Sequence, residues 1–335
     1  MTIKAIQTGA LACAVFLSAI ALSSPVSAQV KVDEQLVPYR ATQGVSGTIK
    51  SVGSDTMNNL MALWAEKYAE SYPNVSVEIE GKGSSTAPPA LCESASNFGP
   101  MSRAMKSKEI DEFEARFGYK PIGLRTAVDM LAVYVHRDNP IAKTGLTLQQ
   151  IDAIFSKNRK GGYEKDVRTW GDIGLTGEWA NKPISLYGRN SASGTYGYFK
   201  KHALFKGDFK DGVKEQPGSA SVVQGIAGDR NGIGYSGMGY RTADVVAIAI
   251  AREPGSKPVP ATAENVSEYP LARFLHLYVN YEPGSKLDPL RAEFLKLVYS
   301  KEGQEVVVKD GFLPVSFALA KTDLAKVGID ISGRP

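Results

Sequence analysis

The stretch Gly188-Arg189-Asn190-Ser191-Ala192-Ser193-Gly194-Thr195 lies between an expected strand, residues 183–187, and an expected helix that starts at Tyr196. The N-terminus of a helix carries unpaired N–H groups and partial positive charge, so it attracts an anion. Gly194 allows a close approach of the backbone, Ser193 and Thr195 add hydroxyl donors, and Arg189 adds a fixed charge with a planar set of donors. These groups predict a socket for a small tetrahedral oxyanion. An ordinary N-capped helix is the alternative.

Two further turns of this kind occur earlier in the chain. Ser54–Met57 follows a strand expected at 47–52, and Gly83–Thr86 follows a strand expected at 75–79. Short strands and helices alternate, which predicts an α/β chain with mostly parallel sheets, and ligands of such sheets bind beyond the carboxyl ends of the strands. Three Ser/Thr/Gly turns in that position, with Arg103 and Arg189 nearby, therefore indicate one shared anion site.

The N-terminus is typical of a secretory signal peptide. Lys4 gives a short positive region, Leu11–Leu22 is apolar, and Val26-Ser27-Ala28 is a small-residue cleavage site. We expect residues 1–28 to be removed, with cleavage after Ala28, and the mature protein to be periplasmic. A retained N-terminal anchor is the alternative.

Composition favours a globular protein of two domains. The chain has 335 residues, of which 43% are hydrophobic and 22% charged. The formal net charge of +4 falls to +3 when Lys4 leaves with the signal. This charge is too small and too evenly spread to indicate a nucleic-acid partner. The three histidines, His136, His202 and His276, are far apart and lack metal-ligand spacing, so we expect neither a metal nor a cofactor.

The chain resembles the periplasmic phosphate-binding proteins, the solute receptors of phosphate ABC transporters, over roughly residues 47–320. The order and the spacing of the matching segments both fit the family, and the Arg-x-x-x-Ser-Gly-Thr element is the most specific of these segments. The segments that carry the resemblance are Gly53-Ser54-Asp55-Thr56-Met57, Gly83-Ser84-Ser85, Phe98-Gly99-Pro100-Met101-Ser102-Arg103, Val128-Asp129-Met130-Leu131-Ala132-Val133, Arg189 with Ser193-Gly194-Thr195, and Gly232-Ile233-Gly234-Tyr235.

The resemblance implies a two-lobed periplasmic binding protein fold of type II, with two crossing strands as the hinge. It assigns residues 47–130 plus 243–320 to one lobe and 131–242 to the other. It also implies a set of ligand-binding residues, which are Thr56, Met57, Ser84, Ser102, Arg103, Asp129, Arg189, Ser193, Gly194 and Thr195.

One position departs from the main pattern of the family. Many members place an Asp after the Phe-Gly turn, where it accepts the proton of hydrogen phosphate, whereas this chain has Ser102 followed by Arg103, as in a second subgroup. Asp55 and Asp129 are the candidates to replace that acceptor. A helix N-cap is the alternative role for Asp55, and a structural partner of Arg189 or Arg125 is the alternative role for Asp129. Arg103 either faces the ligand or covers the surface.

The expected function is therefore capture of inorganic phosphate in a cleft and its delivery, by a monomer, to the membrane permease of an ABC transporter. Another oxyanion, such as sulfate or molybdate, is the first alternative. An exported phosphate-ester hydrolase is a weaker one, because Gly234-Tyr235-Ser236-Gly237-Met238 breaks the Gly-x-Ser-x-Gly nucleophile pattern. We therefore expect no enzymatic activity. A surface adhesion or matrix protein that kept the binding fold is a further alternative.

Overall fold

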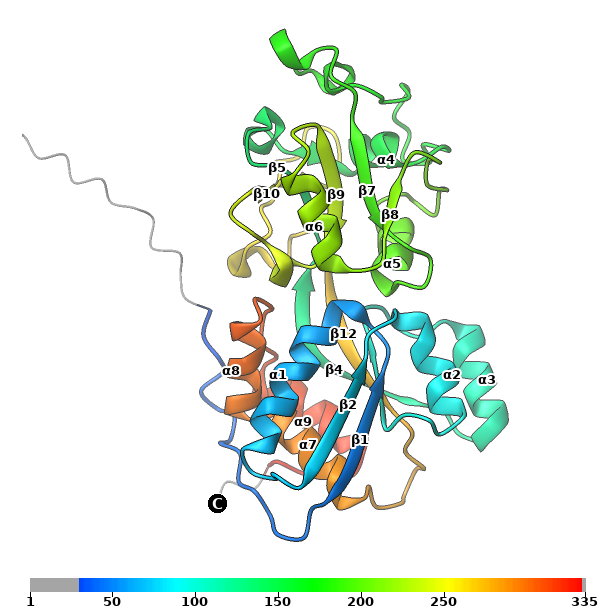
Figure 1. The fold of residues 1–335 in the computed structure, drawn as a ribbon, viewed down its shortest axis with the longest axis vertical. Helices are drawn as coiled ribbons and strands as arrows, with labels where there is room; N and C mark the ends of the chain where they lie inside the picture. The colour runs from blue at the N-terminus through cyan, green and yellow to red at the C-terminus, as the bar shows by residue number, and fades with distance from the viewer. Residues whose placement is uncertain (1–29, 333–335) are drawn as a thin grey trace, which may run out of the picture.

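The structure, a computed structural model, describes residues 30–332, so the predicted signal peptide lies outside the described residues. Two α/β lobes stand one above the other, with only a few chain segments passing between them (Figure 1). Each lobe is built around one five-stranded sheet with its own buried core. The predicted two-lobed α/β fold is confirmed.

The first lobe holds the sheet β2-β1-β3-β12-β4. Strands β2, β1 and β3 are parallel, whereas β12 runs antiparallel to both of its neighbours. These strands are β1 (Gly47–Val52), β2 (Val75–Glu80), β3 (Phe98–Met101), β4 (Ile122–Met130) and β12 (Ala272–Val279). The lobe's helices are α1 (Asn58–Ala69), α2 (Ala87–Cys92), α3 (Ser107–Phe117), α7 (Pro289–Val298), α8 (Lys301–Lys309) and α9 (Phe317–Ala325).

The second lobe holds the sheet β10-β5-β9-β7-β8, in which β9, β7 and β8 are parallel. Its strands are β5 (Ala132–His136), β7 (Ser185–Arg189), β8 (Lys214–Gln216), β9 (Gly232–Ser236) and β10 (Val245–Ala247), and β6 (Leu146–Thr147) pairs with β11 (Ile250–Ala251) beside it. Its helices are α4 (Leu148–Phe155), α5 (Gly194–His202) and α6 (Ser219–Ala227).

Short 3₁₀ helices supply further turns. Two of them, η1 (Asp55–Met57) and η2 (Ser84–Thr86), directly follow β1 and β2 in the first lobe. The remaining ones are η3 (Pro140–Lys143), η4 (Trp170–Ile173), η5 (Gly177–Trp179), η6 (Met238–Tyr240) and η7 (Ala263–Asn265).

Apolar spacing explains how each core forms. The helical face predicted from Met57, Leu60, Met61, Trp64 and Tyr68 is fully buried, which confirms that prediction. In the second lobe the rings of Phe199 and Tyr235 stack with centroids 3.9 Å apart, so α5 is packed firmly on the sheet.

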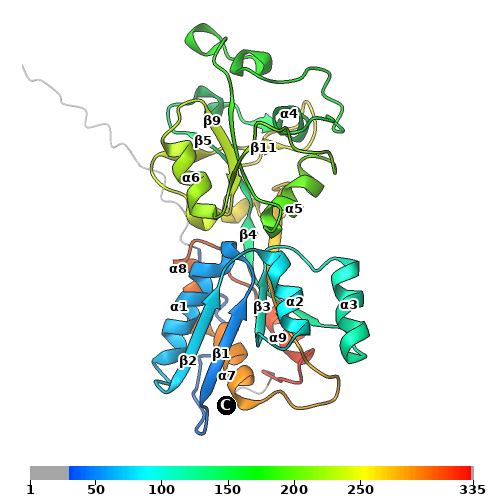
Figure 2. The ribbon, with the colours of Figure 1, turned by 45° about the vertical axis from the view of Figure 1, so that its right-hand side comes forward.

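Two strands cross from one lobe to the other. β4 runs on into β5 with only Leu131 between them, and the N–H of Leu131 donates to the carbonyl of Leu271, next to the start of β12, at 3.1 Å. Figure 2 shows both crossing segments at the waist of the molecule. Within the described part of the chain, no helix is both long enough and apolar enough to span a membrane.

One boundary differs from the sequence-based expectation. Residues from 243 onward were assigned to the first lobe, but β10 pairs antiparallel with β5 and β11 pairs with β6, both in the second lobe. The chain returns to the first sheet only with β12, which starts at Ala272. The apolar run 245–251 fits either sheet equally well by its pattern, so the sequence could not assign it.

Candidate oxyanion-binding site

Four hydroxyl groups meet where the two lobes touch. Thr56 Oγ1 lies 3.0 Å from Thr195 Oγ1, Ser84 Oγ lies 3.3 Å from Ser102 Oγ, and Ser102 Oγ lies 3.5 Å from Thr195 Oγ1. At most 1% of each residue is exposed. Three of these residues come from the first lobe and Thr195 comes from the second, so this hydroxyl cluster bridges the lobes.

The fold explains why these residues converge. Thr56, Ser84 and Ser102 follow the carboxyl ends of the parallel strands β1, β2 and β3, and neighbouring parallel strands end at one edge of a sheet. Thr195 lies in the first turn of α5. The first N–H groups of a helical turn have no acceptor within that turn, so Thr56, Ser84 and Gly194 also bring backbone donors to this edge.

Gly194 is required by the close approach of the lobes. A Cβ atom at this position would lie 2.3 Å from Ser84 Oγ and 2.7 Å from Ser102 Oγ, both on the opposite lobe. Any side chain here would therefore push the N-terminus of α5 away from the hydroxyl cluster.

Two of the predicted binding residues use their polar groups locally. Ser193 is the N-cap of α5, and its Oγ accepts hydrogen bonds from the N–H of Thr195 at 3.1 Å and of Tyr196 at 3.4 Å. The N–H of Met57 donates to the carbonyl of Ser54 at 3.2 Å, and the Met57 side chain is fully buried in the core of the first lobe.

Arg189 lies at the end of β7, is 1% exposed, and pairs with Asp55 of the opposite lobe. Its terminal nitrogens lie 3.1 Å from Asp55 Oδ1, 2.7 Å from Ser219 Oγ and 3.1 Å from the carbonyl of Pro217. Burial lowers the pKa of the Arg189 guanidinium, and the Asp55 carboxylate opposes that shift. The Nε atom is buried without a hydrogen-bond partner among the described residues, so this guanidinium retains one N–H to donate.

Asp129 pairs with Arg273, which sequence analysis did not identify. Arg273 Nε and one terminal nitrogen contact Asp129 Oδ2 at 2.9 and 2.7 Å. The same guanidinium donates to the carbonyl of Ser102 and to Thr195 Oγ1, each at 2.9 Å. Arg273 thus links the crossing strands to the hydroxyl cluster. A charged residue inside the apolar strand 270–279 was the available signal, because charged side chains are rarely buried unless paired.

The alternatives for the two aspartates now have definite outcomes. Asp129 is not the partner of Arg189 or of Arg125, because Arg125 pairs with Asp323 at 2.7 Å. Asp55 is not the N-cap of its own turn, a position held by Ser54. Instead its Oδ1 accepts from the N–H of Ser219, at the start of α6 in the other lobe, at 2.8 Å.

Arg103 lies outside the hydroxyl cluster. Its guanidinium forms a two-point contact with Glu109, with N···O distances of 2.7 and 2.6 Å. Burial would raise the pKa of the Glu109 carboxyl, but the hydrogen bonds from Arg103 and from the Lys106 N–H outweigh it, and the pKa falls below its usual value. Arg103 thus neither covers the open surface nor joins the cluster. It lines a cavity between the lobes.

The site contains hydroxyls, backbone N–H donors and two guanidiniums, and each guanidinium is paired with a carboxylate. This set of donors suits a small oxyanion. Within residues 30–332, no group of three or more His, Cys, Asp or Glu side chains is arranged to hold a metal ion. The buried hydroxyls and guanidinium nitrogens of the site can form hydrogen bonds to an anion that is shielded from water.

Comparison with known proteins identifies the class. Residues 39–302 match the PBP superfamily domain. The chain is 55% identical over 305 residues to the phosphate-binding protein PstS of Pseudomonas aeruginosa, which covers 90% of this chain and 94% of that protein. It is 28% identical over 300 residues to PstS of Bacillus subtilis, covering 88% and 87% of the two chains. The chain therefore belongs to the PBP superfamily and, within it, to the family of the PstS phosphate-binding proteins.

Solved structures agree with this assignment. A protein of Clostridium perfringens, described as a phosphate ABC transporter substrate-binding protein and solved with bound phosphate, is 25% identical. It aligns with a TM-score of 0.65 and covers 80% of this chain and all of that one. An ABC-type phosphate transport receptor of Vibrio cholerae has the same fold, with a TM-score of 0.60 and 21% sequence identity. The alignment again covers 80% of this chain and all of that one.

Proposed function

We propose that this protein is a receptor that captures inorganic phosphate between its lobes for an ABC transporter. The observation that carries the proposal is the hydroxyl cluster of Thr56, Ser84, Ser102 and Thr195, buried at the lobe junction beside Arg189. Relatives of this protein carry the name phosphate-binding protein, and the structurally similar protein of Clostridium perfringens was solved with bound phosphate.

Neutral donors would hold the anion. Each guanidinium of the site already has a carboxylate partner, Arg189 with Asp55 and Arg273 with Asp129, so the four side chains together contribute no net charge. Backbone N–H groups at the starts of η1, η2 and α5 and the four hydroxyls would then replace the water around phosphate. Aligned helix-end dipoles stabilise an anion without a free cation.

Asp55 is the better candidate to accept the proton of hydrogen phosphate. Both oxygens of Asp129 are engaged, Oδ1 by the N–H of Met238 and Oδ2 by two nitrogens of Arg273. Asp55 uses Oδ1 for Arg189 and for the N–H of Ser219, whereas no donor of the described chain bonds its Oδ2. A carboxylate oxygen with a free lone pair beside Thr56 would accept the phosphate proton and would repel sulfate, which has no proton to give.

Binding would proceed by closure of the lobes about the crossing strands. Several contacts that cross the junction are hydrogen bonds or ion pairs, among them Thr56 with Thr195, Asp55 with Arg189, and Ser85 with the carbonyl of Ala192 at 2.9 Å. Polar contacts of this kind can be exchanged for contacts with an anion when the lobes open and close. The closed receptor would work in the periplasm as a monomer and dock on the transporter's permease, and it would perform no catalysis.

Calorimetric titration of the anion-stripped protein tests this function. The proposal predicts one tight site for phosphate at pH 7 and no response to sulfate. Binding of both anions with similar affinity would indicate a general oxyanion receptor. Absence of binding to either would refute the function while leaving the fold intact.

A further inference from the structure

Two cavities lie side by side along the lobe junction, outside the hydroxyl cluster. One has a volume of about 550 Å³ and the other about 460 Å³, and they share Arg103, Lys106, Gly197 and Lys201 in their walls. Arg103 and Lys106 belong to the first lobe, whereas Gly197 and Lys201 lie on α5 of the second. The two cavities therefore form one groove, which we call the junction groove, and its walls come from both lobes.

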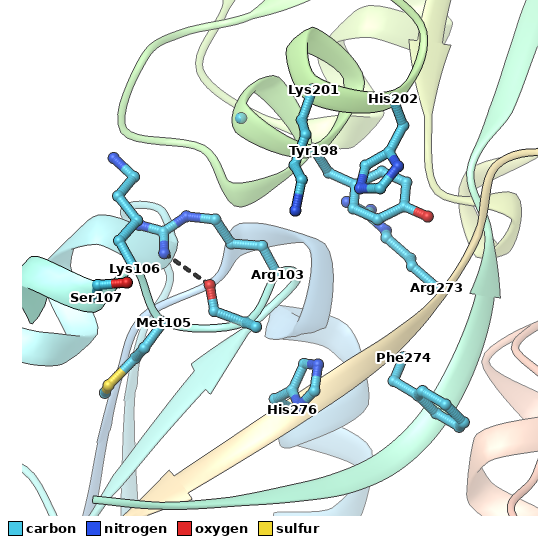
Figure 3. Close-up of a pocket in the computed structure, with 12 residues that line it drawn as sticks. Arg103, Met105, Lys106, Ser107, Tyr198, Lys201, His202, Arg273, Phe274 and His276 are labelled. Carbon is cyan, nitrogen blue, oxygen red and sulfur yellow. Dashed lines mark hydrogen bonds between the residues drawn. The ribbon is translucent and has the colours of Figure 1, made fainter. Parts of the chain in front are cut away.

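The junction groove is lined by cations. Lys106, Lys200, Lys201 and Lys206 contribute ammonium groups, and Arg103 and Arg273 contribute guanidiniums. No Asp or Glu is among the described residues that line either cavity. Within residues 30–332, Lys200 pairs with Asp208 and Arg103 with Glu109, whereas Lys106 and Lys201 have no carboxylate within 4.0 Å. Figure 3 shows Lys201 extending from α5 into the cavity, on the side where Arg103 and Lys106 lie.

Each cavity also reaches a residue of the candidate binding site. Arg273 lines the larger cavity and donates to Thr195 Oγ1 in the hydroxyl cluster. Ser193, the N-cap of α5, lines the smaller one. One residue in the wall of each cavity thus forms a hydrogen bond with Thr195 of the hydroxyl cluster.

We infer that the junction groove is an outer collecting site for hydrated oxyanions, with Lys106 and Lys201 as the residues that draw phosphate toward the hydroxyl cluster. This inference rests on the proposed phosphate-binding function. Both lysines are exposed, so solvent would screen their charge and an anion beside them would keep its water. A cleft lined by one sign of charge raises the local concentration of the opposite ion and so increases the association rate. The lysines therefore act on the rate of capture and not on the closed complex.

Stopped-flow measurement of phosphate binding tests the inference, with intrinsic fluorescence as the signal. In the double variant Lys106→Gln/Lys201→Gln at low salt, we expect the association rate constant to fall about tenfold, the lower end of the range known for electrostatic steering. In about 0.5 M salt the association rate constants of the double variant and the wild type should differ less than about twofold, because the screening length is then shorter than the groove. The dissociation rate constant should change less than about twofold at either salt concentration.

A matched control removes the same net charge elsewhere. Lys143 in η3 and Lys321 in α9 are exposed and line neither cavity, so Lys143→Gln/Lys321→Gln should keep the wild-type association rate. Equal association rates for the groove variant and the wild type at low salt would overturn the inference. So would an equal loss in the control pair, since that would assign the effect to net charge alone.

The same experiment separates failure of the inference from failure of the proposed function. If the wild type itself gives no phosphate-dependent signal in stopped flow and no heat in calorimetry, the function is refuted. If the wild type binds phosphate and the groove variant behaves identically, only the collecting site is refuted. A fall in association rate that persists unchanged in 0.5 M salt would also contradict steering, because it would indicate a structural defect.

Discussion

Arg273 and Asp129 face each other across the paired crossing strands β12 and β4, and Arg273 nitrogens contact Asp129 Oδ2 at 2.9 and 2.7 Å. Asp129 is fully buried and Arg273 is 5% exposed. The pair lies where the chain passes between the lobes, and Arg273 also holds Thr195 of the hydroxyl cluster. One ion pair thus connects the hinge to the candidate binding site.

Arg273→Met should destabilise the fold. The substitution leaves Asp129 as a buried charge without its partner, which costs about 3–5 kcal/mol in free energy of unfolding. Urea unfolding of the anion-free protein measures this cost. Adding Asp129→Asn to the same chain removes the unpaired charge and should restore part of the loss. A single variant within about 0.5 kcal/mol of the wild type would show that the pair contributes little.

Asp55→Asn should reduce discrimination between phosphate and sulfate. The amide can no longer accept the phosphate proton as a charged oxygen and no longer repels sulfate. Arg189 loses its counter-charge, but that change favours both anions alike, so the ratio of the two affinities is the useful measurement. We expect the ratio to fall at least about tenfold, or about 1.4 kcal/mol.

Calorimetry with each anion at pH 7 gives the two affinities. An unchanged ratio of phosphate to sulfate affinity in Asp55→Asn would contradict the role proposed for Asp55. Asp129 would then be the remaining candidate for the proton acceptor. Asp129→Asn is the complementary variant, and its ratio should stay near that of the wild type.

Gly194→Ala should weaken phosphate binding without unfolding either lobe. The added methyl would meet Ser84 Oγ at 2.3 Å, across the junction, so the variant should fold but close incompletely. We expect at least about a 30-fold loss of affinity, or about 2 kcal/mol. Gly197→Ala, one turn along α5, is the matched control because its methyl would lie 3.7 Å from Arg103 Cδ, an ordinary contact. Equal phosphate affinities in the two variants would contradict close packing at Gly194.

His276 should make stability depend on pH. Burial lowers the pKa of this imidazole from 6.5 to about 4, so the unfolded chain binds a proton that the folded chain does not between those values. Stability is complete above about pH 6.5 and is lost as the pH falls toward 4, with a slope of up to about 1.4 kcal/mol per pH unit from this group. Denaturation of His276→Gln over this range should show a shallower slope than the wild type. Identical slopes would show that His276 titrates normally in the folded protein.

The sequence was most informative where a local rule determines a local structure. The turns at Ser54–Met57 and Gly83–Thr86 were predicted because each follows an expected strand and opens a helical pattern, and both lie at the lobe junction. The fully buried face of α1 followed from spacing alone.

Pairings between distant segments were beyond that reasoning. Arg273 and Asp129 are 144 residues apart, and only the register of β12 on β4 sets them opposite each other. Asp55 and Arg189 lie on opposite lobes and contact each other only because the lobes are packed together. A local sequence pattern cannot predict such a contact. The position of β10 in the second sheet was missed for the same reason, because a wholly apolar strand does not specify its neighbours.

The most direct test of the account is a crystal structure of the mature protein with phosphate. We expect one tetrahedral density within hydrogen-bond distance of the hydroxyls of Thr56, Ser84 and Thr195 at the lobe junction, with Arg189 beside it. Phosphate bound only outside the hydroxyl cluster, or a hydroxyl cluster left without an anion at saturating phosphate, would contradict the proposed site.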